Sequence, residues 1–116
     1  MKNIPLILFL LLLFLIVKKR FFDFTDYKSL LEEGGVIIDV RSNAEFASGN
    51  IENSINIPLS EINNVDKLID NKEQNIITCC ASGMRSATAK NILKAKGYKN
   101  VINGGGWSHL NSKIKK

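Results

Sequence analysis

The chain changes character at residues 78–86, which read Thr-Cys-Cys-Ala-Ser-Gly-Met-Arg-Ser. The β-branched residues Ile76 and Ile77 come directly before this stretch, and residues 87–96 after it have helical character. The stretch is therefore predicted to be the turn from a strand into a helix. A loop that enters a helix presents backbone N–H groups that the helix leaves unpaired, at the positive end of the helix dipole. The sequence thus predicts a receptacle for an anion at the position of both cysteines of the chain.

The cysteines of this loop are candidates for a nucleophile. Arg85 lies five positions after Cys80, and a thiol near a fixed cation and several N–H donors ionises more readily than a free cysteine, whose pKa is about 8.5. Because the thiolate is the reactive form, the loop is suited to covalent catalysis. Ser82 and Gly83 allow the backbone to curl so that successive N–H groups converge on one point. The alternative is that Cys79 and Cys80 are small buried apolar residues at the end of a strand.

Four motifs, in order along the chain, resemble those of the rhodanese-like sulfurtransferases. The loop at residues 80–86, Cys-Ala-Ser-Gly-Met-Arg-Ser, resembles the active loop of that family, C-x-x-G-x-R-[ST]. The other matching stretches are Ile37-Ile38-Asp39-Val40-Arg41 with Glu45-Phe46 and Gly49-Asn50-Ile51 after it, Ile55-Asn56-Ile57-Pro58, and Asn103-Gly104-Gly105-Gly106-Trp107. The chain departs from the family at Asn50, where histidine is usual, and at residues 53–54, where a Gly-Ala pair is usual. The resemblance covers about residues 21–112.

The resemblance implies a sulfurtransferase in which Cys80 is the catalytic nucleophile. Its thiolate would take the outer sulfur of a small anionic donor such as thiosulfate and pass it to cyanide, a thiol or a protein acceptor, with no cofactor. Asp39 and Arg41, at the end of a predicted strand, are expected to support the loop by hydrogen bonds without taking part in the chemistry. The other residues of the loop are expected to bind the substrate: Ala81, Ser82, Gly83, Met84, Arg85 and Ser86.

Two other functions remain open at this point. Counted from Cys79, the loop reads C-x5-R-[ST], the signature of cysteine-dependent phosphatases, some of which share the rhodanese fold. Thr78 stands where those enzymes usually have histidine, and no acidic residue follows the loop to protonate a leaving alkoxide. The third possibility is a non-catalytic persulfide carrier or binding module. Cys79 itself is interpreted as a buried strand residue, or else as an auxiliary thiol that resolves an oxidised Cys80.

Alternating strand-like and helix-like segments predict a three-layer α/β domain with a central, mostly parallel sheet flanked by helices. Strands are expected over residues 21–24, 36–40, 54–57, 76–78 and 100–102. Helices are expected after an N-cap at Thr25, after a capping box from Ser42 to Glu45, over residues 59–69 and over residues 86–96. The glycines at 104–106 are expected to form a tight turn, with Trp107 at the domain edge and a frayed basic tail over residues 113–116.

Residues 4–17 are a continuous apolar run of fourteen residues. At about 1.5 Å per residue, a helix of this length falls short of a bilayer core of roughly 30 Å. The run is followed by Lys18-Lys19-Arg20 and lacks the small residues of a signal-peptide cleavage site. We therefore expect residues 1–20 to be an uncleaved single-pass membrane anchor, with the catalytic domain, residues 21–112, facing the cytoplasm. A secreted product and the opposite topology are the alternatives.

The charge distribution favours an anionic substrate. The net charge of the 116 residues is +5, and all 11 acidic residues lie before residue 74, so the half that contains the loop is basic. A metal site is not expected, because Cys79, Cys80 and His109 lack the paired spacing of zinc ligands. Nucleic-acid binding is not expected either, because no recognition motif is present. The protein is expected to be a monomer.

Overall fold

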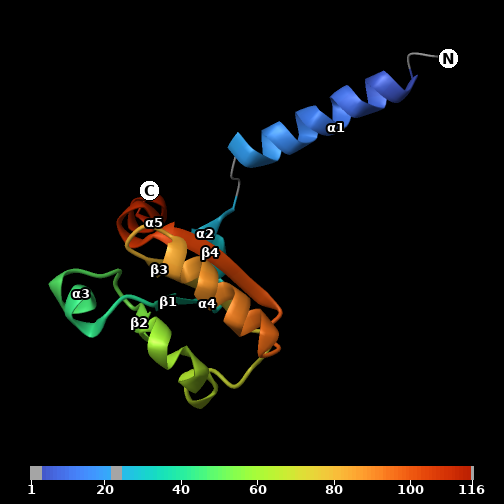
Figure 1. Ribbon diagram of the computed structural model, residues 1–116. Coiled ribbons are helices and arrows are strands. Elements are labelled where there is room, and N and C mark those ends of the chain that lie inside the picture. The colour runs from blue at the N-terminus through green and yellow to red at the C-terminus, as the bar shows by residue number, and fades with distance from the viewer. Residues whose placement is uncertain (1–3, 22–24, 116) are drawn as a thin grey trace.

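The computed structural model describes residues 4–21 and 25–115. Its strands are β1 (Val36–Asp39), β2 (Ile55–Asn56), β3 (Asn75–Cys80) and β4 (Asn100–Gly106). Its helices are α1 (Ile4–Phe21), α2 (Tyr27–Glu32), α3 (Asn43–Ser48), the 3-10 helix η1 (Leu59–Lys67), α4 (Met84–Ala95) and α5 (Trp107–Ile114). The four strands pair in parallel in the order β2-β1-β3-β4 (Figure 1). The predicted α/β class, with a parallel sheet flanked by helices, is confirmed.

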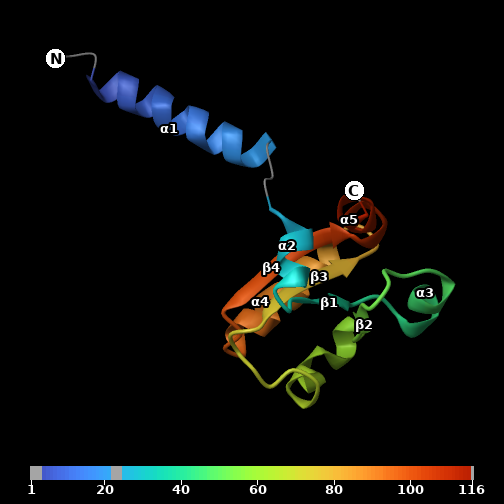
Figure 2. The same ribbon diagram turned by 180° about the vertical axis from the view of Figure 1, so that it is seen from behind.

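Helices cover both faces of the sheet, as the two opposite views in Figures 1 and 2 show for α4 and α2. The face under α4 and η1 packs a larger core of buried residues: Ile38, Val40, Ile57, Ile62, Val65, Ile69, Ile76, Cys80, Ala89, Leu93, Tyr98 and Val101. The face under α2 and α5 packs a smaller core of buried residues: Tyr27, Ile37, Ile51, Ile77, Cys79 and Leu110. Because β1 and β3 are covered on both faces, their sequences are almost continuously apolar.

The carboxyl ends of β1 and β3 lie side by side. Asp39, the last residue of β1, is in register with Cys79, the penultimate residue of β3. Ligand sites in open α/β sheets form where the carboxyl ends of strands meet. The parallel register therefore brings the loop that follows β3 next to the segment that follows β1.

The end of β4 differs from the sequence prediction. Thr78 pairs with Asn103 and Cys80 with Gly106, so β4 contains one residue more than β3 over this interval, which is a β-bulge. Gly105 has a φ of +81°, a conformation that residues with a side chain rarely adopt. A Cβ atom at Gly104 would lie 2.8 Å from Ile77 Cγ2 and 3.0 Å from the Thr78 carbonyl oxygen. The prediction of a tight turn at 104–106 is wrong, because these glycines continue the strand through a bulge.

The helix predicted over residues 59–69 is present, and a second helical segment differs from the prediction. The segment after β2 is a 3-10 helix, and its apolar residues Leu59, Ile62 and Val65 recur at every third position, the period of a helix with three residues per turn. The predicted frayed tail is helical as far as Ile114, because α5 is anchored by Leu110, which is fully buried. The local period of three accounts for the first segment, and the burial of Leu110 accounts for the second.

Two helix N-termini and the first predicted strand follow the prediction only in part. The N-cap of α2 is Asp26, whose carboxylate accepts a hydrogen bond from the Ser29 N–H at 3.1 Å, and not Thr25. The capping box between Ser42 and Glu45 is confirmed at the start of α3. Of the strand predicted at 21–24, Phe21 is the last residue of α1, and residues 22–24 lie outside the described residues.

The apolar helix α1 has exposed side chains, and Leu6 to Leu15 are 46–62% exposed. Within residues 4–21 and 25–115, no helix combines the length and the apolarity that a membrane crossing requires. The predicted membrane-spanning anchor is therefore not supported. Its apolar run has only fourteen residues, and the basic residues Lys18, Lys19 and Arg20 occupy the end of α1.

Candidate active site

The loop of residues 80–86 connects the end of β3 to the start of α4. Cys80 is the last residue of β3, and Met84 is the first residue of α4, two positions before the predicted helix start. Gly83 is the N-cap and has a φ of +103°, so the turn favours glycine at this position. A Cβ atom at Gly83 would also lie 3.3 Å from Gly105 Cα. The predicted strand-to-helix turn is confirmed.

The loop encloses the sulfur of Cys80. The Gly83 N–H donates a hydrogen bond to Cys80 Sγ at 2.9 Å, and Ser86 Oγ lies 3.5 Å from the same sulfur. Burial alone would raise the pKa of the Cys80 thiol, but hydrogen bonds from the Ser86 hydroxyl and from the N–H groups of Ser86, Gly83 and Ser82 outweigh it and lower the pKa. Cys80 is 1% exposed. The loop thus forms the predicted cradle of N–H donors around a thiol that ionises readily, and the catalytic role of Cys80 stays a prediction.

Cys79 lies in a different environment, although it is the next residue along the strand. It is fully buried in the smaller core, on the opposite face of the sheet from Cys80. Burial strongly raises the pKa of the Cys79 thiol, and the nearby carboxylate of Asp39 raises it further. The interpretation of Cys79 as a buried strand residue is confirmed. A thiol that is both inaccessible and protonated is not a suitable nucleophile, so the geometry does not favour the phosphatase alternative.

Asp39 and Arg41 form a buried ion pair behind the loop. Arg41 Nη2 lies 2.7 Å from Asp39 Oδ2, and Arg41 Nε lies 3.0 Å from Asp39 Oδ1. The same guanidinium donates to the carbonyl oxygen of Gly49 at 2.7 Å, and it lies over the Trp107 ring, 4.6 Å from the centroid. The pair therefore fixes α3 and the start of α5 next to the site. No hydrogen bond joins either side chain to Cys80 within the described part of the chain, and the supporting role of the pair stays a prediction.

Arg85 is paired with Glu45, which the sequence suggested only as a capping residue and part of a motif. The two groups form a bidentate ion pair, with Arg85 Nη1 2.8 Å from Glu45 Oε1 and Arg85 Nη2 3.0 Å from Glu45 Oε2. The Arg85 guanidinium, together with the Ser42 N–H, lowers the pKa of Glu45 to about 2. Forty residues separate the partners, so no local pattern could have indicated the pair.

Asn103 of β4 also contacts the loop. Its side chain forms hydrogen bonds with Gly83 and Ser86. The sequence contained Asn103 in a motif but gave it no role, since its orientation depends on the bulge in β4. The remaining loop residues lie at the rim, where Met84 is 79% exposed and Ala81 and Ser82 are exposed.

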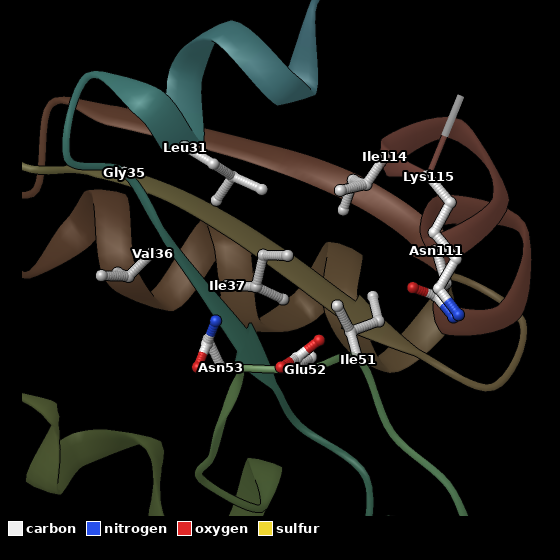
Figure 3. Close-up of a pocket in the computed structure, with 10 residues that line it drawn as sticks. All are labelled: Leu31, Gly35, Val36, Ile37, Ile51, Glu52, Asn53, Asn111, Ile114 and Lys115. Carbon is white, nitrogen blue, oxygen red and sulfur yellow. The ribbon is translucent and has the colours of Figure 1, made fainter.

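The pocket in Figure 3 is separate from the loop. It has a cavity volume of about 320 Å³ and lies between α2, β1, the segment after α3 and the end of α5. Leu31, Ile37 and Ile114 are among its apolar lining residues, and none of residues 80–86 lines it. In the part of the chain that the structure describes, no group of three His, Cys, Asp or Glu side chains could hold a metal ion.

Comparisons with known proteins find sulfurtransferases among the relatives of this chain. A mitochondrial protein of Schizosaccharomyces pombe, named as a candidate thiosulfate sulfurtransferase, is 39% identical over 97 residues, which are 72% of this chain and 68% of that protein. Thiosulfate sulfurtransferase 18 of Arabidopsis thaliana is 35% identical over 72% of this chain and 71% of its own length. The match to the tRNA uridine(34) hydroxylase of Prochlorococcus marinus (strain MIT 9215) is 33% identical but spans only 29% of that protein.

Solved structures share the fold. A rhodanese with anions from Escherichia coli has a TM-score of 0.62 and 32% identity, with coverage of 65% of this chain and 89% of that chain. The human single-domain sulfurtransferase has a TM-score of 0.62 and 27% identity, with coverage of 77% and 90%. The model of the rhodanese-like domain family matches residues 23–113. The chain therefore belongs to the rhodanese-like domain family.

Proposed function

We propose that the protein is a sulfurtransferase that moves a sulfane sulfur through a persulfide on Cys80. The observation that carries this proposal is the position of the Cys80 sulfur within the loop, where the Gly83 N–H lies at 2.9 Å and the pKa of the thiol is lowered. Relatives named thiosulfate sulfurtransferase support a rhodanese-type enzyme. The thiolate required for nucleophilic attack is therefore available below the usual pKa of a cysteine.

The reaction has two displacement steps at sulfur. In the first, the Cys80 thiolate attacks the outer sulfur of thiosulfate, a new S–S bond forms, and sulfite leaves with the electrons of the broken S–S bond. In the second, a thiolate or cyanide attacks the outer sulfur of the persulfide, and the Cys80 thiolate is released. The negative charge on the terminal sulfur of the persulfide is stabilised by the N–H groups of the loop.

Arg85 is suited to bind the donor while it stays paired with Glu45. A guanidinium has five N–H donors, and the ion pair with Glu45 uses one on each of Nη1 and Nη2. The side chain of Arg85 is 38% exposed, so the remaining donors are accessible from solvent. Glu45 would orient the guanidinium, and the unused N–H groups would contact the anionic end of the donor.

Two matched cysteine variants test the proposal. We expect Cys80→Ser to abolish thiosulfate:cyanide sulfurtransferase activity, whereas Cys79→Ser keeps most of it, because Cys79 is buried on the other face of the sheet. The measurement is thiocyanate formation by the purified variants, with folding checked by circular dichroism. Loss of activity in Cys79→Ser, with full activity in Cys80→Ser, would move the nucleophile to Cys79 and support phosphatase chemistry.

We also propose that the apolar N-terminal segment, residues 4–17, associates with a membrane and holds the domain on the cytoplasmic side. The support is the exposure of Leu6 to Leu15 and the basic group of Lys18, Lys19 and Arg20 after them. The test is vesicle flotation of the full chain and of a variant without residues 1–20. We expect only the full chain to float, and equal behaviour of the two proteins would contradict the proposal.

A further inference from the structure

The side chain of Asn103 joins Gly83 and Ser86, two of the residues that contact the Cys80 sulfur. Asn103 Nδ2 donates to the Gly83 carbonyl oxygen at 3.2 Å, and Asn103 Oδ1 accepts from Ser86 Oγ at 2.6 Å. Gly83 contacts Cys80 Sγ through its N–H, and Ser86 contacts it through its hydroxyl. The side-chain amide of Asn103 thus forms hydrogen bonds with the Gly83 carbonyl oxygen and with the Ser86 hydroxyl.

The bulge in β4 fixes the orientation of this amide. Asn103 precedes the extra residue of the strand, and the Gly105 N–H donates to Asn103 Oδ1 at 2.9 Å. Gly105 adopts a positive φ, and Gly104 has no room for a Cβ atom. The Asn103 amide therefore has two acceptor contacts and one donor contact within the protein itself.

The Ser86 hydroxyl has one hydrogen and three acceptors within reach. These are Asn103 Oδ1 at 2.6 Å, the Gly83 carbonyl oxygen at 3.0 Å and Cys80 Sγ at 3.5 Å. Ser86 is fully buried, so solvent does not compete with these acceptors for the hydroxyl hydrogen. When Cys80 is a thiol, its S–H can donate to Ser86 Oγ while the Ser86 hydrogen points to Asn103. When Cys80 is a thiolate, the same hydrogen can turn to the sulfur and stabilise the charge.

We propose that Asn103 is a positioning residue that sets the ionisation of Cys80 through Ser86 and Gly83. It receives the Ser86 hydrogen in the thiol state and keeps Ser86 and Gly83 aimed at the sulfur in the thiolate state. This inference deepens the proposed function and rests on it, because the ionisation of Cys80 matters for catalysis only if Cys80 is the nucleophile. Its test, however, needs no sulfur donor.

The experiment is a double-mutant cycle on the titration of the Cys80 thiolate. The ultraviolet absorbance of the thiolate is followed against pH in the full chain, with Cys80→Ser as the blank. We expect Asn103→Ala to raise the midpoint of the titration and to reduce the thiolate fraction at neutral pH about threefold to tenfold. In a Ser86→Ala background, Asn103→Ala should shift the midpoint by less than half as much.

The matched control is Asn100→Ala, at the other end of β4. Asn100 is exposed, and its side chain donates to the Glu73 carbonyl oxygen at 2.8 Å, far along the strand from the loop. We expect it to leave the midpoint unchanged. An unchanged midpoint in Asn103→Ala overturns the inference, and so does an equal shift with and without Ser86, which would indicate a purely structural or through-space effect.

A second variant keeps the test decisive if Asn103→Ala does not fold. Asn103→Leu keeps nearly the size of the side chain, adds no charge, and loses both the oxygen that accepts from Ser86 and Gly105 and the donor to Gly83. We expect it to raise the midpoint, and again by less than half as much in the Ser86→Ala background. Equal shifts in both backgrounds contradict the inference. If the cycle succeeds but no persulfide forms on Cys80, the proposed function fails and the inference about ionisation stands.

Discussion

At the scale of single residues, Cys79 and Cys80 show how one position along a strand changes the chemistry of a thiol. Successive side chains of a strand point to opposite faces of the sheet. Cys79 therefore enters the smaller core, where burial raises the pKa of its thiol, and Cys80 enters the loop, where N–H and hydroxyl donors lower it. The opposite orientation also keeps the two sulfurs apart, and both cysteines are free. An auxiliary role of Cys79 in resolving an oxidised Cys80 gains no support from this geometry.

The charge of Glu45 is expected to set the affinity for an anionic donor. Glu45→Gln keeps the capping position of α3, since glutamine also serves in a capping box, but it removes the charge that offsets Arg85. We expect the KM for thiosulfate to fall about threefold at low ionic strength, with kcat little changed, because an unneutralised cation near the loop attracts the dianion. The measurement is steady-state kinetics at low and high salt.

High salt provides the internal control for this prediction. Exposed charges are screened as ionic strength rises, so the difference in KM between Glu45→Gln and the unmodified protein should shrink. A higher KM in Glu45→Gln at low salt would contradict the charge argument. That result would indicate that the orientation of Arg85 by Glu45 outweighs the neutralisation of its charge.

At the scale of secondary-structure elements, the site depends on how β4 meets the loop after β3. The two strands run in parallel, and the bulge in β4 lets Asn103 reach residues 83 and 86. A Cβ atom at Gly83 would lie 3.3 Å from Gly105 Cα, whereas Gly105 has open space around it but a φ of +81°, which favours glycine. The glycines at residues 104–106 are thus part of the architecture of the loop.

The replacement of Gly104 tests this dependence. A Cβ atom at Gly104 would lie 2.8 Å from Ile77 Cγ2 and 2.9 Å from Leu110 Cδ2, both in the core. We expect Gly104→Ala to reduce the free energy of unfolding by about 2 kcal/mol, the usual cost of overpacking, and to reduce sulfurtransferase activity. The measurement is urea unfolding together with the thiosulfate:cyanide assay.

Gly97→Ala is the control for this replacement. Gly97 has a φ of +102°, and a Cβ atom there would meet nothing within 4 Å. The substitution should cost only the backbone strain of a positive φ, about 1 kcal/mol, and should leave activity intact. Equal activity in Gly104→Ala and Gly97→Ala would show that the bulge does not control the loop.

The elements that the sequence predicted well are those with local signals. The capping box of α3, the apolar run of β1 and the glycine after α4 each specify a structure within a few residues. The loop was predicted in the same way, from Cys80, Gly83 and Arg85. By contrast, the bulge in β4, the helix α5 and the contacts of Glu45 and Asn103 depend on residues distant in sequence. The helix predicted over residues 59–69 is present as η1, and the prediction left its type open.

At the scale of the whole molecule, the two cores lie on opposite faces of one parallel sheet, and the site lies at its carboxyl edge. Both cores are made of residues 27–114, so α1 contributes to neither of them within the described part of the chain. The buried pair of Asp39 and Arg41 connects β1, α3 and the start of α5. The scaffold that holds the loop is therefore the α/β domain alone.

Acid is expected to destabilise this domain through carboxylates with lowered pKa values. The Arg85 guanidinium lowers the pKa of Glu45 from 4.5 to about 2, and hydrogen bonds from Lys72, Lys96 and Tyr98 lower the pKa of Asp66. Such groups stabilise the folded state above their unfolded pKa, and this contribution is lost as pH falls through the folded pKa. The free energy of unfolding should therefore decrease as the pH falls from about 4.5 towards 2. Urea unfolding at several pH values measures it.

The variant Glu45→Gln combined with Asp66→Asn is the control for the acid effect. Neither amide titrates, so the decrease between pH 4.5 and 2 should be smaller than in the unmodified protein. Because both carboxylates are partly exposed, the difference will be reduced at high salt. An identical decrease in both proteins would assign the acid sensitivity to other groups.

The most direct test of the account is the intact mass of the protein after incubation with thiosulfate and removal of the donor. We expect the mass to increase by one sulfur atom, and peptide mapping to locate that sulfur on Cys80, with Cys79 unmodified. The Cys80→Ser variant should show no increase. A protein that gains no sulfur, or that carries it on Cys79, would contradict the claim that the loop around Cys80 forms a persulfide.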